Sequence, residues 1–155
     1  MTKTHEEYMK MAMEDAIKGY RNGDGGPFGA VVVKDGEVLS VAHNQVIIDH
    51  DPTAHAEMVA IRKACEKIGS HDLKGAVIYA TGEPCPMCLS AIVWANIEEC
   101  YYANTVDDAE RIGFRDNKIY RYFKGEADIL HKTHMPDDEC LAMYDDYRER
   151  KSKIY

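Results

Sequence analysis

The chain has 155 residues, enough for one domain with a sizeable core but too few for two. Its 19 basic and 27 acidic side chains give a formal net charge of −8, which disfavours RNA or DNA as a substrate unless a local basic patch exists. No apolar run approaches the roughly 18 residues of a membrane span, and five cysteines behind a polar N-terminus without a signal peptide indicate a cytoplasmic protein.

Hydrophobic spacing and turn residues predict the first elements in chain order. Apolar residues at three- and four-residue spacing predict an amphipathic helix over 5–22, which the following glycine cluster ends. Two strands, at 28–33 and 38–44, flank an Asp35-Gly36 hairpin turn.

The same reasoning extends to the second half of the chain. Thr53 is the expected N-cap of the helix that follows it. The elements that we expect from here onward are a helix at 54–68, a strand at 76–80, a helix at 86–95, a strand at 99–103, and helices at 105–112 and 137–151.

His55, Cys85 and Cys88 form a candidate zinc site. Three protein ligands are one too few for a closed structural site, whereas catalytic zinc sites keep three and leave the fourth position to water. Two other interpretations weigh less. A redox Cys-x-x-Cys needs no histidine partner, and a structural zinc knuckle would need a fourth cysteine or histidine in a matching motif, which the sequence lacks.

Glu57 lies two residues from the histidine and is a candidate proton carrier. In isolation it would be an ordinary surface glutamate at a helix start, where the helix dipole favours an acidic residue. Next to the candidate metal ligands, however, H-x-E followed by P-C-x-x-C is the signature of zinc deaminases that act on bases and nucleosides. The sequence therefore predicts a hydrolytic deaminase.

Both ligand-bearing segments start a predicted helix. We expect His55 in the first turn of one helix and the two cysteines at the start of a second helix, antiparallel to the first. Helix N-termini favour thiolates over thiols. Asn44, after a strand, could hold a base edge, while Phe28 and Trp94 are more often core residues than substrate-stacking ones.

The chain resembles the cytidine-deaminase-like superfamily and, within it, the short bacterial guanine deaminases. The segments that carry the resemblance are Gly25–Val31, Asp51–Glu57, Ile61–Cys65, Glu83–Cys88 and Gly113–Asp116. The resemblance implies an α/β fold: a three-layer α/β/α sandwich, with a mixed five-stranded sheet flanked by helices, as one domain over residues 1–155.

The region after the fourth strand points to the substrate. Where tRNA deaminases typically carry a basic Lys-x-Gly-Ala segment, this chain has the acidic segment 104–110, followed by a guanine-deaminase-like segment at 113–120. The resemblance implies a homodimer in which residues from about 120 to 155 are swapped between subunits and cap the partner's site. A tRNA adenosine deaminase, a cytosine, guanosine or other amino-heterocycle deaminase, and a non-catalytic zinc module remain alternatives.

The resemblance also implies residue roles. It matches His55, Cys85 and Cys88 to the ligands of one Zn²⁺ per subunit and Glu57 to the proton shuttle, with hydroxide attacking C2 of guanine to give xanthine and ammonia. Asp116 is implied as a second carboxylate near the exocyclic amine. The implied substrate-binding residues are Asn44, Phe28, Ala56, Trp94 and the C-terminal Tyr155. Asn96 and Arg115 depart from the family pattern.

Overall fold

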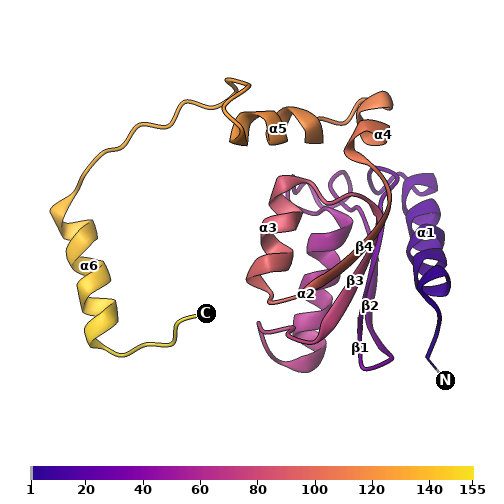
Figure 1. The fold of residues 1–155 in the computed structure, drawn as a ribbon, viewed down its shortest axis with the longest axis horizontal. Helices are drawn as coiled ribbons and strands as arrows, with labels where there is room; N and C mark the ends of the chain where they lie inside the picture. Colours follow the sequence, from indigo (N-terminus) through magenta and orange to yellow (C-terminus); the bar gives the residue numbers. More distant parts are fainter. Residues whose placement is uncertain (1) are drawn as a thin grey trace.

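The computed structural model describes residues 2–155, which form one four-stranded sheet with helices on both faces (Figure 1). In chain order the elements are α1 His5–Arg21, β1 Gly29–Lys34, β2 Glu37–His43, α2 Ala56–Ile68, β3 Ala76–Gly82, α3 Pro86–Trp94, β4 Glu99–Asn104, α4 Val106–Arg111, α5 Asp116–Phe123 and α6 Asp138–Glu149.

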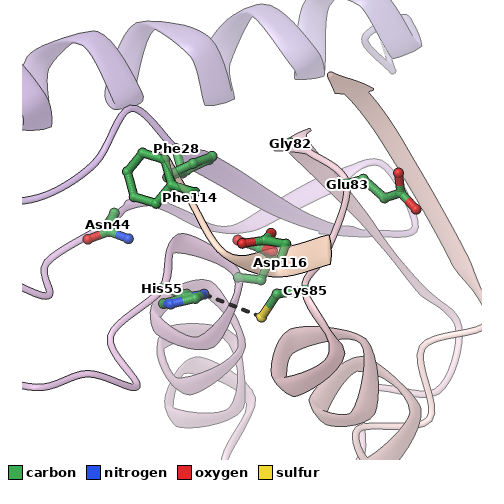
Figure 2. Close-up of a pocket in the computed structure, with 9 residues that line it drawn as sticks. Phe28, Asn44, His55, Gly82, Glu83, Cys85, Phe114 and Asp116 are labelled. Atoms are coloured by element: carbon green, nitrogen blue, oxygen red, sulfur yellow. Dashed lines mark hydrogen bonds between the residues drawn. The ribbon is translucent and has the colours of Figure 1, made fainter. Parts of the chain in front are cut away.

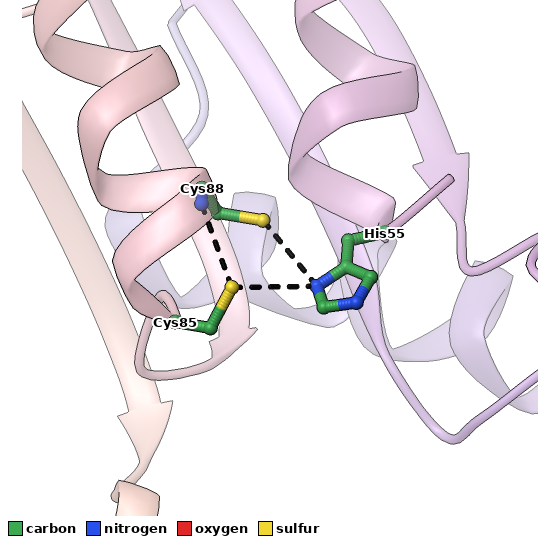
Figure 3. A group of neighbouring side chains, drawn as sticks. All are labelled: His55, Cys85 and Cys88. Carbon is green, nitrogen blue, oxygen red and sulfur yellow. Dashed lines mark hydrogen bonds between the residues drawn. The ribbon is translucent and has the colours of Figure 1, made fainter. Parts of the chain in front are cut away.

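The strand order, β2-β1-β3-β4, sets the direction of the helices. β1 runs antiparallel to β2 and to β3, while β3 and β4 are parallel, so β2, β3 and β4 all run the same way. α2 and α3 connect these co-directional strands and therefore both run back against them. The two helices are thus parallel, and the expectation of antiparallel helices is wrong. Figure 3 shows both helices starting beside the metal-ligand side chains.

Two apolar layers hold the sandwich together. α1 covers one face of the sheet, where Tyr8 and Ala12 pack against alternate residues of β1 and β3. α2 and α3 cover the other face, where Ala60, Ala64 and Ile92 belong to the larger core cluster. The expected three-layer α/β/α arrangement is therefore confirmed.

Local sequence signals explain where several elements begin. Thr4 and Glu7 form a reciprocal capping box at the start of α1. Asp35 and Gly36 both have positive φ, as a tight hairpin turn requires. The expected N-cap at Thr53 is wrong, because both the backbone N–H and the hydroxyl of Thr53 donate to Asp51, and the helix begins after His55.

The chain after β4 differs most from expectation. Residues 105–155 form three helices and no strand, so the sheet of residues 2–155 has four strands instead of five. Helix α5 was not predicted, although its apolar positions recur at helical spacing. Helix α6 has no buried residue and stands apart from the body of the molecule in Figure 1.

No helix within residues 2–155 combines the length and apolar character needed to cross a membrane.

Candidate active site

The three predicted metal ligands meet at the carboxyl ends of the parallel strands. His55 is the N-cap residue of α2 and Cys85 that of α3, while Cys88 lies in the first turn of α3. The His55 Nδ1 lies 3.5 Å from both sulfur atoms, and the three ligand atoms lie within 4.8 Å of one another (Figure 3). Two sulfurs and one imidazole nitrogen suit zinc, and three ligands leave one position open.

The sulfur atoms differ in their affinity for protons. A hydrogen bond from the Cys88 side chain, supported by bonds from His55 and from the Cys88 backbone, lowers the pKa of Cys85 to about 4 against the opposing effect of burial. The hydrogen bond to Cys85 and burial raise the pKa of Cys88 above its ordinary range. Without a metal the pair therefore holds one negative charge, and zinc binding releases the remaining proton because a zinc ligand must be a thiolate.

Glu57 points its carboxylate into this site from the first turn of α2. The residue is 6% exposed. Burial, the largest effect, raises the pKa of Glu57 from its ordinary value of 4.5 to about 7. A carboxyl group poised near neutrality can both accept and release a proton at physiological pH. Glu57 is not needed as a metal ligand, so it is available for proton transfer.

A pocket opens directly above the metal ligands (Figure 2). It gathers the carboxyl ends of β2 and β3, the start of β1 and the start of α5 at one edge of the sheet. Ligands bind at this edge in open α/β sheets. The residues that line the pocket are Phe28, Asn44, His55, Glu57, Gly82, Glu83, Cys85, Phe114 and Asp116.

Asn44 presents an amide to the pocket. The residue is 5% exposed, and its Oδ1 accepts a hydrogen bond of 3.0 Å from the backbone N–H of Val46. Its Nδ2 donates no hydrogen bond within residues 2–155, and Figure 2 shows this nitrogen turned toward the pocket. The amide can therefore donate to an acceptor on a bound ring.

Two aromatic rings form an apolar wall of the pocket. Phe28 and Phe114 meet edge to face, with ring centroids 4.9 Å apart. A Cβ at Gly26 would lie within 3.0 Å of both rings, so only glycine leaves room for the pair at this point. The two rings therefore give the pocket an apolar side against which a planar heterocycle can pack.

Asp116 closes the pocket from the first turn of α5. Burial, followed by the charge of Cys85, raises the pKa of Asp116 above its ordinary range. One turn later, the Tyr120 hydroxyl donates a hydrogen bond of 2.6 Å to the carbonyl of Pro84, next to Cys85. This bond joins α5 to the metal-binding turn and fixes Asp116 above it.

The structure brings some predicted substrate residues together and separates others. Ala56 is buried between His55 and Glu57 at the start of α2, just behind the pocket. Trp94 does not line the pocket, because it sits at the opposite end of α3, about 13 Å along the helix from Cys85. It is 65% exposed, and its ring lies 6.1 Å from the ring of Tyr155.

Sequence reasoning missed three pocket residues, Gly82, Glu83 and Phe114. All three belong to or adjoin segments that carry the family resemblance, which was the available signal. Glu83 turns its carboxylate away from the metal ligands and accepts a hydrogen bond of 3.1 Å from the backbone of Val106 at the start of α4. It therefore has a visible structural partner.

Comparison with known proteins agrees with this geometry. Residues 2–104 match the family described as the cytidine and deoxycytidylate deaminase zinc-binding region. The chain therefore belongs to this zinc-binding deaminase family, and it is a hydrolytic deaminase.

Comparison with individual proteins shows which deaminases the chain resembles. The chain is 48% identical to the guanine deaminase of Bacillus subtilis (strain 168) over 117 residues, 76% of this chain and 75% of that protein. The solved structure of the Bacillus subtilis guanine deaminase matches with a TM-score of 0.90 and 40% identity, covering 99% of both chains. A tRNA-specific adenosine deaminase of Aquifex aeolicus is 43% identical over 98 residues, 63% of this chain and 64% of that protein.

Proposed function

We propose that this protein deaminates guanine by hydrolysis, giving xanthine and ammonia. One observation carries the substrate assignment. The structural match to a guanine deaminase extends over 99% of the chain at a TM-score of 0.90, and thus includes the segment after β4. That segment supplies Phe114 and Asp116 to the pocket. The same segment was predicted to resemble guanine deaminases.

The metal site and Glu57 account for the attack on the ring. His55, Cys85 and Cys88 would hold zinc, which when bound would supply a hydroxide nucleophile near neutral pH by lowering the pKa of water. The Glu57 carboxylate would take up the proton that the attacking water loses. It then delivers a proton to the ring nitrogen beside C2, so that the carbon can accept the nucleophile. Each such transfer contributes roughly 10² to 10⁴-fold to the rate.

Asp116 and Asn44 complete the reaction. Asp116 stays protonated to a higher pH than an exposed aspartate, so it can donate to the exocyclic amine and let ammonia leave. The proton that the new C2 hydroxyl loses as its carbonyl forms then restores the Asp116 carboxyl group. Asn44 donates its Nδ2 hydrogens to an acceptor on the purine edge. Phe28 and Phe114 exclude water from one side of the ring.

An assay of ammonia and xanthine release tests the proposal. Zinc-loaded protein is incubated separately with guanine, guanosine, adenine, cytosine and a tRNA anticodon stem-loop. Ammonia from guanine, with stoichiometric xanthine, is expected. If guanine is left intact while another substrate is deaminated, the zinc chemistry stands and the substrate assignment is wrong.

The tRNA stem-loop is included because the Aquifex relative favours it as an alternative. The charge of the chain argues against it. The net charge is −8, and Asp107, Asp108 and Glu110 make α4 acidic. A phosphate backbone gains affinity mainly from basic side chains. Editing of the stem-loop in place of guanine would overturn this argument.

A homodimer is the second part of the proposal. Residues 124–155 extend away from the sandwich after α5, and Tyr155 lies beside His71 and Trp94. Large apolar side chains on both α6 and α3 have no cover within one chain. They are Leu89, Val93 and Trp94 on α3 and Leu141, Met143 and Tyr144 on α6. Exposed apolar faces of this kind are typical of subunit interfaces, and a second copy held between them would form a swapped dimer.

Light scattering and subunit mixing test the dimer. We expect a molar mass of two chains. A Glu57→Gln copy with an intact C-terminus, mixed with a copy truncated after Phe123, should regain activity if residues 124–155 act on the partner's site. A wild-type protein that is monomeric and fully active would refute the dimer. A truncated protein that is active by itself, without the Glu57→Gln copy, would refute the capping role.

The cytoplasm and purine catabolism are the proposed setting. All five cysteines are free thiols, and disulfides are rare in reducing compartments. Conversion of guanine to xanthine is a step of purine breakdown. Fractionation of the source cells, with activity followed in each fraction, tests the location.

A further inference from the structure

A histidine outside the pocket bridges two carboxylates beside Asn44. His43 is the last residue of β2 and immediately precedes Asn44. Its Nδ1 lies 2.8 Å from Asp15 on α1, and its Nε2 lies 2.8 Å from Asp24 in the loop after α1. The three side chains are 13–22% exposed, so solvent only partly screens them. We call this group the Asp15–His43–Asp24 bridge.

Asp24 extends the bridge to the rim of the pocket. Its carboxylate also accepts a hydrogen bond of 2.9 Å from the side chain of Asn22. Its backbone carbonyl accepts from the N–H groups of Ile47 and Ile48, both at 3.0 Å. The bridge therefore joins the end of α1, the end of β2 and the loop that follows Asn44.

Two glycines show how closely these parts fit. A Cβ at Gly19 would collide with the His43 ring, and a Cβ at Gly25 would collide with the Asn44 side-chain oxygen. The ring and the amide thus both lie against the backbone of residues 19–25. Any shift of this segment would act on the orientation of Asn44.

We propose that the Asp15–His43–Asp24 bridge is a positioning device that fixes Asn44 for substrate binding. The inference rests on the proposed function, in which Asn44 holds the purine edge. The bridge does not touch the metal ligands, and His43 lies behind the pocket rather than in it. Breaking it should therefore weaken substrate binding and leave zinc binding and the proton transfers intact.

Steady-state kinetics with guanine test the positioning role. The variants are His43→Gln and Asp15→Ala, and Glu14→Ala is the matched control, because Glu14 is an exposed carboxylate next to Asp15 that pairs with Lys10. We expect KM to rise about 10-fold in the two bridge variants, equivalent to about 1.4 kcal/mol, with kcat within about threefold and full zinc content. Unchanged KM in a folded, zinc-loaded bridge variant overturns the proposal.

Amide hydrogen exchange gives a readout that does not depend on guanine. The amides of Ile47 and Ile48, which donate to Asp24, should exchange faster in Asp15→Ala than in Glu14→Ala. If the wild type releases no ammonia from guanine, the proposed function fails, and exchange alone then decides whether the bridge holds the loop. Equal exchange in both variants overturns the bridge. Should His43→Gln fail to fold, Asp15→Ala decides both tests.

Discussion

Replacement of Glu57 by glutamine should make the metal-free protein more stable and the zinc-loaded protein inactive. The carboxyl group is buried, and burial raises its pKa from 4.5 to about 7. A raised pKa means that the folded state binds the proton more tightly than the unfolded state does. Glu57 therefore costs no stability well below pH 4.5, costs progressively more between pH 4.5 and 7, and costs its full amount above pH 7.

The size of this cost follows from the two pKa values. One pKa unit corresponds to about 1.36 kcal/mol, so the full cost is about 3 kcal/mol. At pH 5 the cost is about 1 kcal/mol, and at pH 8 it reaches about 3 kcal/mol. Glutamine has nearly the same shape and no charge, and its own burial cost does not vary with pH. The pH dependence of the stability difference therefore isolates the carboxylate.

Urea unfolding of the chelator-treated, reduced proteins at pH 5, 6 and 8 measures this difference. Glu66→Gln is the control, because Glu66 lies on the same helix but is exposed. In parallel, zinc-loaded Glu57→Gln should bind about one zinc and lose at least about 10³-fold in kcat. A stability difference that is the same at pH 5 and pH 8 would refute the buried-carboxylate reasoning. Full activity with full zinc content would refute the proton-transfer role.

Three further changes should separate positioning, proton donation and metal binding. Tyr120→Phe removes the hydrogen bond to Pro84 and should lower the free energy of unfolding in urea by about 1 kcal/mol. It should also lower kcat severalfold while the zinc content stays unchanged. Asp116→Asn should lower kcat about 10²-fold, with KM for guanine nearly unchanged in the same assay. Chelation should abolish ammonia release, and zinc restored at 100 times its Kd should stabilise the protein by about 2.7 kcal/mol in urea unfolding.

The metal site could be predicted from the sequence because its constraints are local. H-x-E and C-x-x-C each place their residues within one helix start, and the chemistry of three ligands plus one carboxylate leaves few alternatives. The direction of the two helices could not be read in this way. It depends on β1 lying between β2 and β3, which is a property of strand order.

The segment after β4 was harder to predict because its partners are distant in sequence. Helix α5 has Ile119, Tyr120 and Phe123 at helical spacing, but the polar residues between them hid the pattern. The resemblance implies that Trp94 and Tyr155 bind substrate. Within one chain their rings lie 6.1 Å apart at the far end of α3, and the role of Tyr155 in the partner's site stays a prediction. A contact between residues 61 positions apart has no signature in local periodicity.

The order of the site residues along the chain has a consequence for how new specificities can arise. The three metal ligands and Glu57 all lie between residues 55 and 88, within the sandwich. Phe114, in the loop between α4 and α5, and Asp116, in the first turn of α5, follow its last strand. The metal centre and one side of the substrate pocket are therefore carried by separate stretches of polypeptide. Exchange of residues 105–155 between relatives should redirect the same hydrolysis to another heterocycle without rebuilding the metal centre.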